Sequence, residues 1–258
     1  MNGLKEQLRY LADKYETKDF IEADPIQFPR KYCIDTDYAG RIMEDKRNVE
    51  ISGFITAWLS YGNREQIIKT ANNLHILMDW KPYDYLMSQE WREFEGSEAR
   101  LYRFYTYGDY FELLQRLYTV YYFWNDLQDA VLDEKFKCYD CTLKAKYIYE
   151  LQTIFEGIAG IPKTSENSAC KRLAMFLRWM IRRDSPVDMG IWERCQSEKL
   201  IIPLDTHVHQ QALKMGITKR KSADMRTAKE ITDYFNDIFP GDPAKGDFAL
   251  FGYGVNNS

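Results

Sequence analysis

The chain has 258 residues, of which 45% are hydrophobic and 29% are charged, and its formal net charge is −4 at pH 7. This is the composition of an ordinary globular protein, and no apolar run is long enough to span a bilayer. The acidic balance excludes a protein that coats nucleic acid through its overall charge, so any site for a polyanion must be local. The first ten residues are charged and amphipathic, so we expect no secretory signal and a cytoplasmic location.

Helical periodicity dominates the first half of the sequence. Gly62 and its polar neighbours interrupt an apolar stretch and predict a turn between two helices. The helices predicted in this half cover residues 4–15, 45–59, 64–78, part of 82–98 and a long aromatic segment, 110–132. We find no convincing pair of alternating strands, so the predicted fold class is all-α.

The second half continues the helical pattern. Further helices are predicted over residues 143–155, 169–183, 205–215 and 223–239. Asp184 and Asp188 are predicted to be turn residues, and Asp247 is predicted to cap a last short helix that runs toward Tyr253.

Two segments of this half are basic and contain no acidic residue, namely 170–183 and 206–223. In the first of them, a helical projection gathers the large apolar side chains on one side. Lys171, Arg178 and Arg182 fall on the opposite side. We therefore expect a basic stripe that faces away from the core.

Asp205 follows a buried-type apolar run and precedes a helical pattern, which predicts that it caps the N-terminus of that helix. Lys171 stands at the start of the basic helix. An amine and a carboxylate held together at two helix ends can carry out imine chemistry on an electrophilic carbon. The spacing alone does not decide whether the two groups meet.

Residues 169–255 resemble the helix-hairpin-helix DNA glycosylase superfamily, which includes endonuclease III and the 8-oxoguanine glycosylases. The segment Pro203–Val208, Pro-Leu-Asp-Thr-His-Val, is similar to a Pro-Val-Asp-Thr-His-Val segment of that superfamily. The Asp of the superfamily's segment is catalytic, and Asp205 stands at its position. Lys171 looks like the superfamily's Schiff-base lysine. The whole chain also resembles an uncharacterised bacterial family that we associate with this superfamily, with residues 168–182 and 200–207 as its signature.

This resemblance implies a two-lobed helical fold over residues 1–258 as a single unit. One lobe would combine the terminal helices with residues 140–258, which carry the hairpin and the Asp-capped helix. The other, residues 45–135, would carry the loop that fills the gap left by an extruded base. In the superfamily that loop is a Leu-Ser-x-Gln segment, and Leu59–Asn63 of this chain resembles it. The Gln is missing here, and Tyr61 or Asn63 would take its place.

The implied activity is that of a DNA glycosylase with associated lyase activity, which excises a damaged base such as an oxidised purine. Lys171 would attack C1′ and Asp205 would stabilise the developing charge or shuttle protons. The implied contacts to damaged double-stranded DNA come from Arg172, Arg178, Arg182, Tyr61, Asn63 and His207. We expect a monomer without metal or cofactor. No four-cysteine cluster follows Asp205, so the iron-sulfur cofactor of endonuclease III is not implied, and the i, i+2 spacing of His207 and His209 points the two side chains apart, which does not suit a metal site.

A plainer interpretation stands beside this one. Lys171, Arg178 and Arg182 would form a solvated helix face, and Asp205 would be only a helix cap. The protein would then be a non-catalytic helical module that binds nucleic acid or protein through its basic faces.

Overall fold

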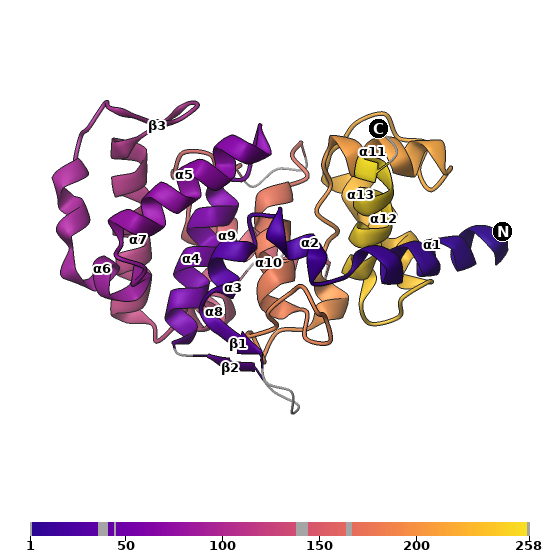
Figure 1. Cartoon of the computed structure of the whole chain (residues 1–258), viewed down its shortest axis with the longest axis horizontal. Helices are drawn as coiled ribbons and strands as arrows, with labels where there is room; N and C mark the ends of the chain where they lie inside the picture. Colours follow the sequence, from indigo (N-terminus) through magenta and orange to yellow (C-terminus); the bar gives the residue numbers. More distant parts are fainter. Residues whose placement is uncertain (1, 36–40, 44, 138–143, 164–166, 257–258) are drawn as a thin grey trace. The chain divides into compact units, whose positions relative to one another are not determined.

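The computed structural model describes residues 2–35, 41–43, 45–137, 144–163 and 167–256 (Figure 1). The fold is all-α, as predicted. The chain divides into two compact units. The terminal unit comprises Met1–Glu22, Cys138–Tyr149 and Thr164–Ser258, and the central unit comprises Ala23–Lys137 and Glu150–Lys163.

The terminal unit contains both ends of the chain. Its helices are α1 (Asn2–Tyr15), α2 (Asp19–Glu22), the start of α9 (Lys146–Ile154), α10 (Lys171–Ile181), α11 (Thr206–Lys214), α12 (Met225–Asn236) and α13 (Gly246–Asn256), with short 3₁₀ turns η3 (Ser197–Lys199) and η4 (Pro243–Lys245). The predicted helices over 4–15, 169–183, 205–215 and 223–239 are confirmed with small shifts at their ends.

Helix α13 packs against α1 and α11, so the first and last helices of the chain are in contact (Figure 1). Leu8 and Ala12 of α1 are completely buried. Gly252 of α13 permits the close approach, because a Cβ there would lie 2.3 Å from the ring of Tyr15. The apolar core that results fixes α13 beside the helices that carry the candidate site.

The central unit is built around α4 (Lys46–Leu59), in which every residue from Val49 to Leu59 is buried. The other elements are α3 (Gln27–Arg30), α5 (Arg64–Leu77), α6 (Pro82–Ser88), α7 (Tyr107–Phe123), α8 (Leu127–Leu132), the end of α9, the 3₁₀ turns η1 (Glu90–Phe94) and η2 (Glu134–Phe136), and four short strands. Contacts from α3, α5 and α6 surround α4. The predicted helices over 45–59 and 64–78 are confirmed.

The prediction of one long helix over residues 110–132 is wrong. The helix ends at Phe123, and α8 starts at Leu127 after a cap by Asp126, whose side chain accepts a hydrogen bond from Asp129 N at 2.7 Å. Lys46 Nζ also lies 2.9 Å from the Asp126 carboxylate. These interactions hold Asp126 outside helical conformation and separate the two helices.

The structure also contains two strand pairs that the sequence did not predict. Strands β1 (Cys33–Asp35) and β2 (Arg41–Met43) pair antiparallel, as do β3 (Arg100–Tyr102) and β4 (Tyr105–Thr106). Strands of two or three residues are too short to show an alternating pattern. Within the described ranges, no helix combines the length and the apolar character needed to cross a membrane.

Candidate functional site

Lys171 is the first residue of α10. Cys170 precedes it in the left-handed conformation, with φ of 49°, and its backbone N–H donates a hydrogen bond to Ser168 Oγ at 3.1 Å. This turn brings the chain abruptly into the helix. The Lys171 side chain remains 36% exposed, so its amine can reach a ligand.

Asp205 caps α11, as predicted. Its Oδ1 accepts a hydrogen bond from Val208 N at 2.9 Å, while Oδ2 lies 3.4 Å from Nζ of Lys171. The buried run Leu200–Leu204 anchors the segment that leads to the cap. One carboxylate oxygen therefore holds the helix and the other faces the amine, so the structure brings the two predicted residues together.

The environment of this pair suits an anionic ligand. The first turn of α10 contains no acidic residue and lies at the positive end of the helix dipole, which favours the binding of phosphate. Arg172 follows Lys171 and is half-buried, and His207, two residues after Asp205, is exposed. Both are close to the Lys171–Asp205 pair along the chain.

Arg178 and Arg182 do not form a solvent-facing stripe, and that prediction is wrong. They are only 3% and 2% exposed. Arg178 pairs with Asp188 at 3.1 Å and with Asp247, and Arg182 pairs with Asp188, Asp242 and Glu16. Carboxylates from distant segments enclose the helix on its polar side as well, so these arginines cannot contact DNA phosphates.

Asp188 lies in the bend that follows α10, as predicted, and it is also part of this buried network. Asp247 belongs to the network too, rather than being the helix cap that the sequence predicted. Asp188 is completely buried between the two guanidinium groups. Helix α13 already begins at Gly246, so Asp247 lies within its first turn and not at its cap. The carboxyl groups neutralise two arginines that would otherwise be isolated in the core.

Asp247 connects the buried network to the candidate site. Burial raises the pKa of its carboxyl group to about 7, Arg178 opposes that shift, and the charges of Asp205 and Lys171 respectively raise and lower the pKa. A proton on Asp247 therefore changes the field at the Lys171–Asp205 pair near neutral pH. The only sequence signal for this residue is an acid within the otherwise apolar segment Gly246–Asn256.

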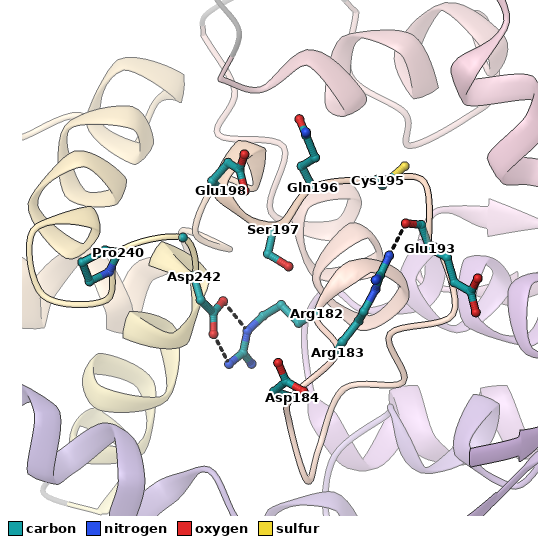
Figure 2. Close-up of a pocket in the computed structure, with 11 residues that line it drawn as sticks. Arg182, Arg183, Asp184, Glu193, Cys195, Gln196, Ser197, Glu198, Pro240 and Asp242 are labelled. Atoms are coloured by element: carbon teal, nitrogen blue, oxygen red, sulfur yellow. Dashed lines mark hydrogen bonds and ion pairs between the residues drawn. The ribbon is translucent and has the colours of Figure 1, made fainter. Parts of the chain in front are cut away.

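A hollow of about 530 Å³ opens at the other end of α10 (Figure 2). In it Arg182 makes a two-pronged contact to Asp242, at 2.7 and 2.8 Å, and Arg183 donates to the carbonyl of Glu193. The 11 residues of α10, at about 1.5 Å per residue, separate this hollow from Lys171 by about 16 Å. Its remaining charged lining is acidic, so it does not suit the phosphate of a nucleotide.

Tyr61 and Asn63 lie in the central unit. Asn63 caps α5, accepting a hydrogen bond from Gln66 N at 3.1 Å. The Tyr61 hydroxyl accepts one from Phe104 N at 3.3 Å, and its ring packs edge-on against Tyr102. Asn63 therefore supports its own helix, whereas Tyr61 supports the hairpin of β3 and β4, and the most exposed ring in this region is that of Phe104.

The sequence matches a family described as proteins of unknown function, DUF2400, over residues 24–256. The chain belongs to this family. No curated protein and no solved structure matches it with significant similarity. Membership in DUF2400 therefore names the chain's relatives without naming a reaction, and the chemistry has to be argued from the site.

Proposed function

We propose that this protein is a DNA glycosylase with associated lyase activity, which excises a damaged base, such as an oxidised purine, through a Schiff base on Lys171. The observation that carries the proposal is the distance of 3.4 Å between Lys171 Nζ and Asp205 Oδ2. The two-lobed helix-hairpin-helix fold, the location in the cytoplasm and action as a monomer on double-stranded DNA belong to the same proposal.

The reaction uses the two groups in sequence. Lys171 transfers its ammonium proton to Asp205, and the neutral amine attacks C1′ of the damaged nucleotide. The bond between C1′ and the base breaks, and the leaving base takes the proton from Asp205. The C1′–O4′ bond then breaks as O4′ takes a proton from the attached nitrogen, which gives a protonated imine between Nζ and C1′. The Asp205 carboxylate removes a C2′ proton, and the electron pair of that C–H bond forms a C2′=C3′ double bond as the 3′ phosphate leaves.

Binding contributes the remaining requirements. Extrusion of a nucleotide costs a few kcal/mol and needs phosphate contacts on both sides of the site. The backbone N–H groups of the first turn of α10, with Arg172 and His207, are the candidates for these contacts. Arg178 and Arg182 are not, because both are buried in ion pairs.

Borohydride trapping tests the proposal. Reduction of the imine during incubation with duplexes that carry different lesions should leave a covalent protein–DNA adduct, and Lys171→Gln should abolish it. Lys214→Gln, which removes an exposed lysine of α11 in the same unit, is the control and should form the adduct at the wild-type rate.

Asp205→Asn separates chemistry from folding. Asn is as good an N-cap as Asp, so α11 should remain intact by circular dichroism. Loss of the carboxylate should slow adduct formation by about 100-fold. Failure to trap an adduct with any lesion would overturn the proposal and favour a non-catalytic binding module. An adduct that survives Lys171→Gln would overturn the assignment of the Schiff base to Lys171.

A further inference from the structure

The hairpin of β3 and β4 ends in a two-residue tip, Arg103 and Phe104 (Figure 1). Phe104 is 81% exposed, more than any other large apolar side chain in the described part of the chain. Arg103 adopts the left-handed conformation, with φ of 50°, as the tight connection of a hairpin requires. Burial of this ring by a partner would release free energy that its exposure forgoes.

The tip stands on a rigid base. The Tyr102 hydroxyl donates a hydrogen bond of 2.5 Å to the carbonyl of Tyr61, and the ring of Tyr105 stacks on Trp58 with 4.0 Å between centroids. The Trp58 indole N–H in turn donates to Ala159 O at 2.7 Å. The hairpin is therefore held on both strands, and little further ordering is needed when Phe104 enters a partner.

The charge around the tip selects the partner. Residues 99–108 contain two arginines and no acid, in a chain whose net charge is negative. Arg100 and Arg103 are exposed, and Arg100 Nε donates to Arg103 O at 3.0 Å. The Arg103 guanidinium lies 5.3 Å from the Tyr61 ring centroid and 5.9 Å from that of Phe104, so an exposed cation neighbours the exposed ring.

An aromatic ring flanked by guanidinium groups matches one partner in particular. The base steps of duplex DNA accept apolar wedges, and the phosphates on either side accept arginine. We propose that Phe104 inserts into the base stack of a duplex at a weakened pair, while Arg100 and Arg103 bind the flanking phosphates. The choice of DNA rests on the proposed function, but the wedge is argued from the hairpin alone.

The test uses a duplex that holds a tetrahydrofuran abasic-site analogue next to 2-aminopurine. This analogue has no C1′ leaving group, so insertion is measured apart from the Lys171 chemistry. Wild-type protein should raise the 2-aminopurine fluorescence by unstacking it. Phe104→Ala should remove that rise and weaken binding by about tenfold, as loss of a stacking aromatic does elsewhere.

Two further variants sharpen the result. Phe123→Ala removes another exposed aromatic ring of the central unit, 68% exposed on α7, and should behave as the wild type. Arg103→Gln should weaken binding to damaged and undamaged duplexes alike and reduce the slope of log affinity against log salt by about one.

The possible results separate the wedge from the proposed chemistry. A fluorescence rise that persists in Phe104→Ala would overturn the wedge, even if borohydride traps an adduct. A rise that depends on Phe104 without any trapped adduct would support the wedge and overturn only the glycosylase reaction. Failure to bind any duplex, or binding to anionic vesicles alone, would also overturn the wedge.

Discussion

Removal of the Asp188 carboxylate tests whether the buried network stabilises the terminal unit. Asp188 is completely buried, and its two oxygens face Arg178 Nε at 3.1 Å and Arg182 Nη1. The variant Asp188→Asn keeps the size of the side chain and removes its charge. Its amide can accept from one guanidinium only, because the NH₂ group then points its hydrogens at the other.

The expected loss follows from the partners that remain. Breaking a buried ion pair by removal of one member costs about 3–5 kcal/mol. Arg178 keeps Asp247, and Arg182 keeps Asp242 and Glu16, so we place the loss at the lower end, about 3 kcal/mol. For a chain of this size in urea, that corresponds to a midpoint lower by about 1 M.

The assay is urea unfolding, followed by tryptophan fluorescence and circular dichroism. The control is Asp237→Asn, which removes an exposed carboxylate 3.7 Å from Lys5 in the same unit and should cost less than about 0.5 kcal/mol. A midpoint for Asp188→Asn that equals that of the control would refute the view that the network is a stabilising part of the core.

Three further predictions concern the backbone and two buried titratable groups. Gly190 and Gly216 both have positive φ, 64° and 70°, but of the two only Gly190 has backbone close to the position of an added Cβ, 2.6 Å from Arg182 O. Gly190→Ala should therefore lower the urea midpoint clearly more than Gly216→Ala, which should cost about 1 kcal/mol. The pKa of Asp247 rises from 3.8 to about 7 on folding, so between these values the folded state binds a proton that the unfolded state has released. The free energy of unfolding should therefore fall as the pH rises from about 4 to about 7. Asp247→Asn should flatten that decline in unfolding measured at about pH 5 and about pH 8. Burial lowers the pKa of His75 to about 4, so its ring should stay neutral in an NMR titration until about pH 4 and stability should be lost as the pH falls from about 6.5 toward 4; a ring that titrates near pH 6.5 would contradict this.

Features that depend on neighbours in sequence were predictable. Asp45 and Asp205 cap helices by hydrogen bonds to residues two or three positions on, at 2.9 Å each. Such a bond requires only a short polar side chain before a helical pattern. Gly216, with φ of 70°, lies just after the C-cap of α11, and a glycine at that position is a common signal for the end of a helix.

The burial of Arg178 and Arg182 was not predictable from the helical projection. A projection shows which side chains share a face but not what packs against that face. The acids that enclose these arginines are distant, with Asp242 lying 60 positions after Arg182 and Asp247 lying 69 after Arg178. A basic stripe on one helix has the same pattern whether it meets water or carboxylates.

The same limit explains the elements that the sequence missed. The start of α8 depends on Glu50, a buried acid of α4 whose carboxylate accepts hydrogen bonds from Leu127 N at 3.1 Å and from the Tyr121 hydroxyl at 2.7 Å. Leu127 lies 77 positions after Glu50, and Tyr121 lies 71 positions after it. Local patterns around residues 110–132 favour one continuous helix, and these tertiary contacts divide it together with the local cap by Asp126.

Asp205 shows why the structural and the catalytic interpretations of this chain do not exclude each other. The hydrogen bond from Val208 N to Oδ1 fixes the rotation of the carboxylate, and that rotation leaves Oδ2 3.4 Å from Lys171 Nζ. A cap that is rigid on one oxygen is a prepositioned acid or base on the other. Asp205→Asn therefore separates the two roles at one position: unchanged stability with slowed trapping requires the second role, and unchanged trapping leaves only the cap.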